Sequence, residues 1–494
     1  PELIAATETT PLVPVATATE QPSHESVALQ VPEITREEAD ITLEAEDVSI
    51  PTGCSVSIVP RLGYSGTGYL SGLNAENGST LELEADIPAT QHYDITVVLG
   101  ADTPSTCRIL ANGEPVYTLK AEENENFVRA TVQGIFLSKG KCKLEIEPVS
   151  GIVDIDCVEL VNNTSLYDED AAIAQTPVNP HASASAKALL KFLADSYGRK
   201  IVTGQYVSDS TNRELEQIYQ VTGAYPLIRF ADMQNYSRNG GNAAQATAVE
   251  DSLAWAQEGG IAGLSWYWNA PAGNASIYAK DTTFDLSAAV TDKDIATATD
   301  AQLSQMAASG EISEGCYAMI QDIDAVSEQL KKLADADVPV LWRPLMEAGG
   351  DWFWWGASGA DAYRWLWELM YTRMTEYHQL NNLLWIWNGQ SSSYQVDKSQ
   401  YDIASLDVYV KDKTEAYGSR YEQYVALRNM TGGKLLALSE CSTVPDMNAM
   451  FRDNAVWSFF GLWYAPYLGE YTSNDALLSV YHSEGALVRG DYQP

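Results

Sequence analysis

The first third of the chain alternates apolar and polar residues with a period of two. Short runs of this kind lie between residues 39 and 162 and are separated by Gly, Asn and Pro. This period places the apolar side chains on one face of a strand, and closely spaced strands of this kind are typical of an all-β sandwich. The runs are DITLEAED (40–47), TLELEADI (80–87), YDITVVLG (93–100), VRATVQGIFL (128–137), CKLEIEPV (142–149) and VDIDCVELV (153–161). We predict a jelly-roll-like β-sandwich domain over 39–162.

A different pattern begins near residue 185, where apolar runs of strand length alternate with segments of helix length. Repeated βα units of this size predict a parallel (β/α)8 barrel, the TIM barrel. A doubly wound open sheet is the alternative, but no Gly-rich nucleotide loop follows any strand. The strand candidates are 199–206, 225–232, 260–268, 338–347, 382–388, 402–410, 434–441 and 455–464. The helices between them are expected around 211–222, 244–258, 316–336, 360–380, 420–430 and 474–488.

One polar segment precedes the β-rich pattern, and another separates it from the barrel pattern. Residues 1–38 begin with a stretch rich in Thr, Pro, Ala and Glu, and we interpret them as a tether. We interpret residues 163–184 as a linker. We therefore expect a tether (1–38), a β-sandwich (39–162), a linker (163–184) and a barrel domain (185–494). The first residues lack the basic region and apolar core of a signal peptide. An expectation of export therefore cannot rest on a targeting segment and has to come from the expected function.

Charge and composition narrow the classes of function. The formal net charge is −37 and no basic stripe is present, which argues against nucleic acid as a partner. No stretch approaches the ~18 apolar residues that span a membrane. Four of the six cysteines lie in the first third without CxxC spacing, so zinc is disfavoured, and disulfides and buried thiols both remain open. The five histidines are scattered, which disfavours a Ser-His-Asp hydrolase or a His-ligated metal enzyme.

Carboxylates, amides and aromatic residues remain at the predicted strand ends, where barrel enzymes carry their active sites. These residues are Gln205, Asp232, Tyr267, Trp268, Glu347, Asn388, Tyr409, Glu440 and Trp463. Glu347 ends the fourth strand and Glu440 the seventh, so they can face each other across the barrel mouth. Two carboxyl groups roughly 5–5.5 Å apart can attack and protonate a glycosidic bond with retention, whereas a wider gap leaves room for water and gives inversion.

The stretch VPVLWRPLMEAGGDWFWWG (338–356) joins one of these glutamates to a cluster of aromatic rings. Aromatic faces stack on the apolar faces of sugars. If the strand continued to its last residue, Arg343, Leu345 and Glu347 would point the same way. Arg343 is then expected either to keep Glu440 ionised or to form a salt bridge inside the barrel. Tyr409 is placed to hydrogen-bond Glu440 or to pack at the rim.

Several of these motifs together resemble glycoside hydrolase family 26. They are RPLMEAGGDWFWWG (343–356), LLALSEC (435–441), GLSWYWNAP (263–271) and WNG (387–389), and the similarity spans about 180–490. The resemblance implies a (β/α)8 barrel, most often a retaining endo-β-1,4-mannanase, with Glu347 as acid/base and Glu440 as nucleophile. It places Trp352, Tyr409 and Trp463 at positions that line sugar subsites. The residues expected to contact substrate are Tyr267, Trp268, Arg343, Trp352, Tyr409 and Trp463.

Two positions depart from that family. Met346 and Tyr267 stand where the family usually has histidines that bind the sugar next to the cleaved bond. A thioether does not donate a hydrogen bond, and a tyrosine carries its hydroxyl further out. The sequence therefore constrains the reaction more closely than it constrains which sugar is bound.

The first domain resembles carbohydrate-binding module family 35. The resemblance rests on LEAED (43–47), GYSGTGYL (63–70) and VDIDCVEL (153–160). It implies a structural calcium ion held by Glu44, Glu46 and Asp156, and carboxylate oxygens suit calcium. A surface stripe of acidic residues is the alternative.

We expect an extracellular or cell-surface enzyme that cleaves β-1,4-mannosidic bonds in mannan, glucomannan or galactomannan of plant cell walls. It is expected to act as a monomer, without a cofactor for catalysis. The alternatives are the same chemistry on xylan or mixed-linkage β-glucan, or a polysaccharide-binding protein without catalysis.

Overall fold

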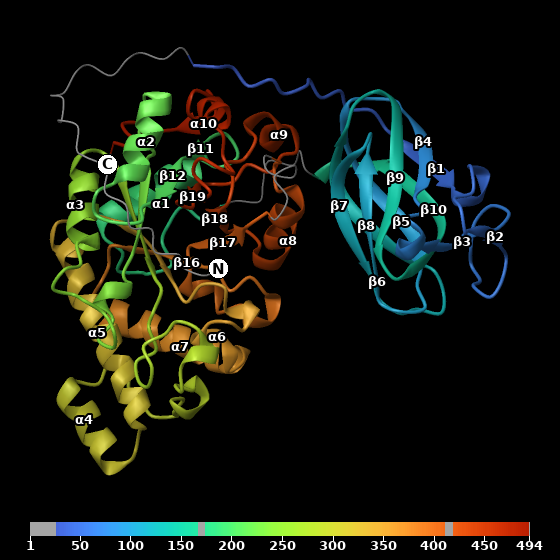
Figure 1. Ribbon diagram of the computed structural model, residues 1–494. Helices are drawn as coiled ribbons and strands as arrows, with labels where there is room; N and C mark the ends of the chain where they lie inside the picture. Colours follow the sequence, from blue (N-terminus) through green and yellow to red (C-terminus); the bar gives the residue numbers. More distant parts are fainter. Residues whose placement is uncertain (1–25, 166–172, 411–417, 494) are drawn as a thin grey trace.

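A computed structural model describes residues 26–165, 173–410 and 418–493 of the chain. They form two lobes, a β-sandwich and a larger α/β barrel (Figure 1). The expected tether falls largely on 1–25, and part of the expected linker on 166–172, which lie outside the described residues.

The β-sandwich packs two antiparallel sheets against each other. β2, β3, β10, β5 and β8 follow one another in the larger sheet, with β1 paired to β10, and the smaller sheet has the order β4-β9-β6-β7. Along β4 every second residue is buried, so Leu81, Leu83, Ala85 and Ile87 enter the core as the alternating pattern predicts. The strands are β1 (Asp40–Glu44), β2 (Ser55–Ser57), β3 (Tyr69–Asn74), β4 (Leu81–Ile87), β5 (Gln91–Gly100), β6 (Ser105–Ala111), β7 (Glu114–Ala121), β8 (Val128–Leu137), β9 (Gly140–Ser150) and β10 (Ile152–Asn162).

The second lobe is a closed barrel in which all eight predicted strands are present and consecutive strands pair in parallel. The closed order excludes the open-sheet alternative. The barrel strands are β12 (Gly204–Tyr206), β13 (Ile228–Asp232), β14 (Ile261–Trp266), β15 (Val340–Pro344), β16 (Leu383–Trp387), β17 (Ile403–Val408), β18 (Leu435–Cys441) and β19 (Phe460–Leu462).

Helices surround the barrel. They are α1 (Ala184–Ser196), α2 (Arg213–Thr222), α3 (Ala248–Gln257), α4 (Asp300–Ser309), α5 (Glu314–Asp335), α6 (Trp354–Ala357), α7 (Ala360–Thr372), α8 (Tyr421–Thr431), α9 (Met447–Arg452) and α10 (Asn474–Tyr481). The last helix ends earlier than expected because β20 (Ala486–Leu487) pairs with β11 (Ile201–Val202). None of the described helices is both long and apolar enough to cross a membrane.

The expected linker is partly built into the barrel domain. The Val178 amide donates to Asp402 Oδ1 at 2.7 Å, and the Ser183 hydroxyl caps α1 by accepting from the Ala186 amide. The structured part of the second lobe therefore begins several residues before 185.

The two lobes touch along one side of the sandwich. β7 lies against α8, and the hydroxyl of Tyr421 on α8 donates to the carbonyl of Gln133. His92 Nε2 lies 2.9 Å from the carbonyl oxygen of Arg452. Upstream of the sandwich, Val27 pairs with the barrel domain, its amide donating to the His482 carbonyl at 2.7 Å.

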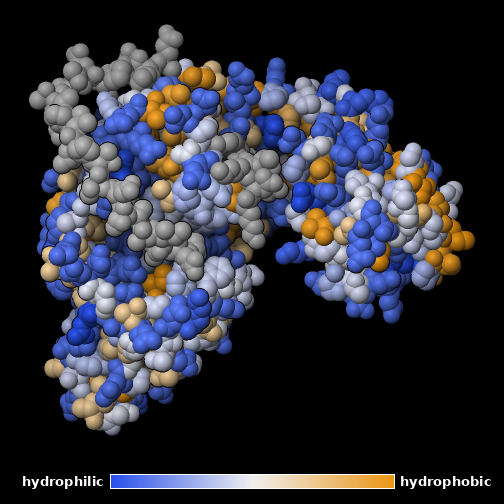
Figure 2. Space-filling view, in the orientation of Figure 1, coloured by the Kyte–Doolittle hydropathy of each residue, from blue (hydrophilic) through white to orange (hydrophobic). Residues whose placement is uncertain are grey.

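The visible surface of both lobes is mostly hydrophilic (Figure 2). Apolar colour gathers at the edge of the sandwich farthest from the barrel. Exposed aliphatic side chains of β2 and the loop after it include Val56, Ile58, Val59 and Leu62. All six cysteines lie in the described residues and are free thiols.

Candidate active site

The acid/base candidate Glu347 reaches the barrel mouth through an irregular turn. β15 ends at Pro344, and both Leu345 (φ 51°) and Glu347 (φ 54°) are left-handed. Strand alternation, which predicted a shared face for Arg343, Leu345 and Glu347, therefore stops at Pro344, and the turn instead of the strand brings the Glu347 carboxyl group to the cluster that Arg343 contacts. The Glu347 amide donates to the backbone carbonyl of Asn388 at 2.7 Å, which fixes the turn against the next strand. Left-handed non-glycine residues of this kind are typical of functional sites.

The glycines after Glu347 bring an aromatic ring back over it. A side chain on Gly350 would meet the Trp352 ring at 1.9 Å, so a larger residue there would push the ring away from its place. The Trp352 Nε1 donates to Glu347 Oε2 at 3.1 Å, and Trp352 is 47% exposed. Trp352 thus lies beside Glu347 and remains open to a ligand, as expected of a subsite residue.

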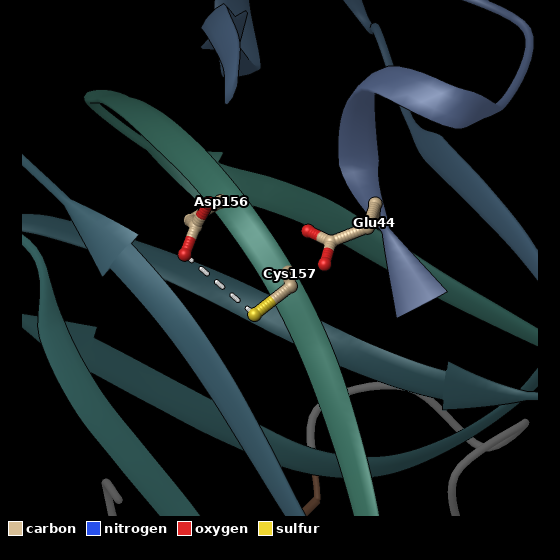
Figure 3. Close-up of side chains that lie close together, drawn as sticks. All are labelled: Glu44, Asp156 and Cys157. Carbon is tan, nitrogen blue, oxygen red and sulfur yellow. Dashed lines mark hydrogen bonds between the residues drawn. The ribbon is translucent and has the colours of Figure 1, made fainter. Parts of the chain in front are cut away.

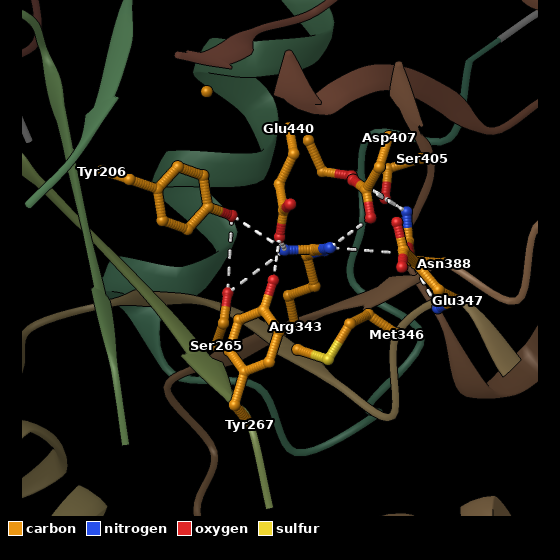
Figure 4. A network of polar contacts seen from close by, with 12 residues as sticks. Tyr206, Ser265, Tyr267, Arg343, Met346, Glu347, Asn388, Ser405, Asp407 and Glu440 are labelled. Atoms are coloured by element: carbon orange, nitrogen blue, oxygen red, sulfur yellow. Dashed lines mark hydrogen bonds and ion pairs between the residues drawn. The ribbon is translucent and has the colours of Figure 1, made fainter. Parts of the chain in front are cut away.

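Glu440, near the end of β18, accepts three hydrogen bonds at the barrel mouth, and those from Arg343 and Tyr267 are drawn in Figure 4. Arg343 Nη1 donates to Oε1 at 2.6 Å and the Tyr267 hydroxyl donates to the same oxygen at 2.5 Å. The Tyr409 hydroxyl donates to Oε2 at 2.6 Å. Only 3% of Glu440 is exposed. Donors of this kind hold a carboxylate charged and in one orientation.

Arg343 ties Glu440 to a third carboxyl group. Its side chain is fully buried, and Nη2 lies 2.5 Å from Asp407 Oδ2. Asp407 also accepts from the Ser439 hydroxyl at 2.7 Å. A fully buried guanidinium does not contact substrate, so the expected substrate contact of Arg343 was wrong. The ion pairs with Asp407 and Glu440 fit the alternative expectation of a salt bridge inside the barrel.

The three carboxyl groups form one electrostatic unit. One oxygen each of Glu347, Asp407 and Glu440 lie within 4.8 Å of one another. Burial, followed by the charge of Glu440, raises the pKa of Glu347. Burial also raises the pKa of Asp407 well above its usual value, with Glu440 and Glu347 adding to the effect and Arg343 opposing it. Like charges so close together favour a proton on Glu347.

The two family departures lie close to this unit. Met346 is fully buried, and its carbonyl accepts from the Trp355 Nε1 at 2.8 Å. Tyr267 follows β14, and its hydroxyl turns onto Glu440 instead of lying further out. The hydrogen bonds to Glu347 and Glu440 come from Trp352, Arg343, Tyr267 and Tyr409.

Aromatic rings complete the mouth. Trp463, directly after β19, is partly exposed and lies between Tyr267 and Tyr409, with ring centroids 5.9 Å and 6.5 Å away. Trp268 was expected to contact substrate, and this was wrong. It is fully buried, stacks on Trp266 at 4.1 Å and donates to Asp322 Oδ2 at 2.7 Å. Strand alternation past the end of β14 turns Tyr267 inward and Trp268 into the helix layer.

Sequence reasoning missed Asp407 and Tyr206. Asp407 lies on β17, two residues before Tyr409. Alternation along a strand therefore predicts that both side chains point to one face. Tyr206 ends β12, and its hydroxyl accepts from Arg343 Nη1 at 2.9 Å. Its position at a strand end was the available signal.

In the sandwich lobe, two of the three acidic residues expected to bind calcium, Glu44 and Asp156, lie together with Cys157. Glu44, Asp156 and Cys157 offer atoms within 4.8 Å of one another (Figure 3). Glu46 accepts from the amides of Thr67 and Gly68, while its Oε2 is buried without a hydrogen-bond partner. Burial is the first cause of a raised pKa at both Glu44 and Asp156, and neighbouring carboxylates add to it. An unpartnered buried oxygen among hard carboxylate donors fits a calcium ion.

Comparisons with known proteins agree with this geometry. Residues 178–490 match glycosyl hydrolase family 26, and residues 41–162 match carbohydrate-binding module family 35. A mannan endo-1,4-beta-mannosidase of Thermothelomyces thermophilus is 32% identical over 92% of this chain and 90% of its own length. Mannan endo-1,4-beta-mannosidase B of Piromyces sp. is 30% identical over 91% of this chain and 77% of its own length.

Solved structures show the same two-lobe order. The crystal structure of a Podospora anserina GH26-CBM35 beta-(1,4)-mannanase is 29% identical, with a TM-score of 0.62, and the match covers 92% of this chain and 99% of that one. A ruminal GH26 endo-beta-1,4-mannanase shares the fold at 23% identity, with a TM-score of 0.71, and the match covers 93% of this chain and 99% of that one. The chain therefore belongs to glycosyl hydrolase family 26 and is a glycoside hydrolase with a family 35 carbohydrate-binding module.

Proposed function

We propose that this protein is a retaining endo-β-1,4-mannanase. The observation that carries the proposal is the short separation of the two glutamates, with an oxygen of Glu347 within 4.8 Å of an oxygen of Glu440. That separation suits direct attack on the sugar, whereas an inverting enzyme needs a gap of about 6.5–9.5 Å for water. The names of the Thermothelomyces and Piromyces relatives support β-1,4-mannan as the substrate.

Each glutamate has the environment that its role requires. Glu440, paired with Arg343 at 2.6 Å, attacks the anomeric carbon as a carboxylate. Glu347, whose pKa is raised by burial and by Glu440, donates its proton to the departing glycosidic oxygen. In the second step Glu347 takes a proton from water, the water oxygen displaces Glu440, and the sugar keeps its β configuration.

The identity of the sugar is the finer part of the proposal. Mannan, glucomannan or galactomannan is the first candidate. Xylan or mixed-linkage β-glucan is the second, because the buried Met346 offers no donor and the Tyr267 hydroxyl is committed to Glu440.

Release of reducing ends from mannan, glucomannan, galactomannan, xylan and mixed-linkage glucan tests both parts. We expect the fastest release from a mannan and its loss, by about 10³-fold or more, in E440A. E347A should retain activity on an aryl glycoside with a good leaving group, since no proton is then needed. A preference for xylan or glucan overturns the substrate, and full activity of E440A overturns the mechanism.

We also propose that Glu44, Glu46 and Asp156 hold a calcium ion that stabilises the binding module. The charge of the ion would offset the burial and the neighbouring carboxylates that raise the pKa of Glu44 and Asp156. A chelator should lower the melting temperature of the full-length protein, and E46Q should abolish this sensitivity. An unchanged melting temperature contradicts the calcium site.

The proposed substrate also suggests where the protein acts. A cell-wall polysaccharide is met outside the cell, so we propose an extracellular or cell-surface enzyme that acts as a monomer. Fractionation of the producing cells and light scattering of the purified protein test these two points. Activity confined to the cell lysate contradicts the first, and a dimer mass contradicts the second.

A further inference from the structure

The two oxygens of Glu440 are not equivalent. Oε1 accepts from both Arg343 and Tyr267, whereas Oε2 accepts only from Tyr409 among the described residues. A carboxylate oxygen has two in-plane lone pairs. Both lone pairs of Oε1 are therefore occupied by donors, and one lone pair of Oε2 is left for the sugar.

Tyr267 is held rigidly in the position that produces this asymmetry. Its amide donates to Asp232 Oδ1 at 2.9 Å, which anchors the turn after β14 to the end of β13. Its ring meets Phe353 and Trp463 edge-on, with centroids 6.0 Å and 5.9 Å away. Burial and the charge of Glu440 raise the pKa of Tyr267 well above its usual value, so the hydroxyl keeps its proton and remains a donor.

We propose that Tyr267 is a positioning residue that, with Arg343, blocks Oε1 of Glu440 and selects Oε2 as the attacking oxygen. This inference rests on the proposed role of Glu440 as the nucleophile. It replaces the expected role of Tyr267 as a substrate contact.

The same contacts serve both chemical steps. When Oε2 bonds to the anomeric carbon, the glycosidic carbon–oxygen bond breaks with its electron pair on the departing oxygen, which takes the Glu347 proton. Oε1 then becomes the carbonyl oxygen of the ester. When water gives a proton to Glu347 and attacks the anomeric carbon, the bond from that carbon to Oε2 breaks and the returning negative charge is shared between Oε2 and Oε1, where Arg343 and Tyr267 already donate hydrogen bonds. Both steps therefore depend on the hydroxyl of Tyr267.

Y267F tests the proposal because it removes only that hydroxyl. We expect kcat to fall by about 10–100-fold, the effect of losing one hydrogen bond to a charged group, with KM changed less than about threefold. Trapping of the enzyme by a 2-deoxy-2-fluoro glycosyl fluoride should slow in parallel.

Y225F is a matched control. The Tyr225 hydroxyl also donates to a glutamate, Glu216 Oε1 at 2.9 Å, but this pair lies at the exposed surface of the barrel domain. Y225F should leave kcat, KM and the rate of trapping at wild-type values.

Two results would overturn the proposal. An increase in KM at unchanged kcat makes Tyr267 a substrate contact, and a fall in kcat with trapping at the wild-type rate shows that the Tyr267 hydroxyl does not assist attack by Glu440. A crystal structure of the trapped wild-type glycosyl-enzyme gives a test that does not depend on folding of the variant. We expect an ester through Oε2 with Tyr267 on Oε1, and an ester through Oε1 overturns the assignment. Absence of any Glu440 ester would overturn the proposed mechanism instead.

Discussion

Arg343 organises the active site although no part of it is exposed. Its guanidinium contacts Glu440, Asp407 and the hydroxyl of Tyr206. The sequence was sufficient to predict that Glu347 and Glu440 meet at the barrel mouth, because each lies at or just after the end of an apolar run in a distinctive motif. It was not sufficient to predict Asp407, because a carboxyl group in a strand looks the same whether it caps a loop or pairs with a buried guanidinium. It also misplaced Trp268, since the end of β14 decides which of two adjacent rings faces the mouth.

Asp407→Asn tests the role of the third carboxyl group. Asparagine keeps the shape of the side chain but removes the charge that faces buried Arg343, and breaking a buried pair costs about 3–5 kcal/mol. We expect kcat/KM to fall at least about tenfold and the free energy of unfolding to fall by a few kcal/mol, measured by steady-state kinetics and urea denaturation.

The control for this variant is Glu250→Gln. Glu250 pairs with Lys332 at 2.7 Å on the surface, with both side chains about half exposed. Such a pair is worth about 0–1 kcal/mol, so this variant should differ little from wild type. Equal behaviour of the two variants would contradict the role given to Asp407.

At the scale of elements, hydrophobic periodicity predicted the barrel strands, and each of the six alternating runs contains a strand of the sandwich. The hairpin of β6 and β7 was missed, although its turn, Asn112–Gly113, has positive φ at both residues and the Asn-Gly sequence that favours such turns. α1 was missed because its start lies among polar linker residues. The segment just before it is held by Asp402, which accepts from the amides of Val178 and Trp385, two residues far apart in the sequence.

Asp402→Asn tests this connection through pH. Burial raises the pKa of Asp402 to about 6. The folded protein therefore binds this proton more tightly than the unfolded chain, and its stabilising contribution is present below pH ~4 and lost as pH rises through about 6. Asparagine does not titrate, so the variant should be less stable than wild type at pH 4, with the difference shrinking by pH 8. Melting curves across this range measure it, and a constant difference would contradict the assignment.

At the scale of the whole molecule, the sequence predicted two domains but not their contact. The contact is made by side chains from separate elements, such as Tyr421 on Gln133 and Arg452 over the Phe136 ring at 5.8 Å. Burial lowers the pKa of His92 at the same contact. Periodicity within one domain contains no information about such pairings. Docking of the module against the barrel is thus a property that only the three-dimensional structure reveals.

The double variant Y421F/R452A should loosen this docking. It removes one hydrogen bond and one cation–π contact, together worth about 1–3 kcal/mol. We expect calorimetry to resolve separate unfolding of the module and the barrel, while hydrolysis of short soluble oligosaccharides stays unchanged. A single transition identical to that of wild type would show that these contacts do not hold the lobes together.

The central claim is that Glu440 forms a covalent bond to the sugar while Glu347 acts as acid and base. The most direct test is mass-spectrometric mapping of the protein after reaction with a 2-deoxy-2-fluoro-β-glycosyl fluoride of the sugar that it hydrolyses. The account predicts one added sugar on the peptide that contains Glu440. A sugar on any other residue, or no covalent adduct while the polysaccharide is still cleaved, would contradict it.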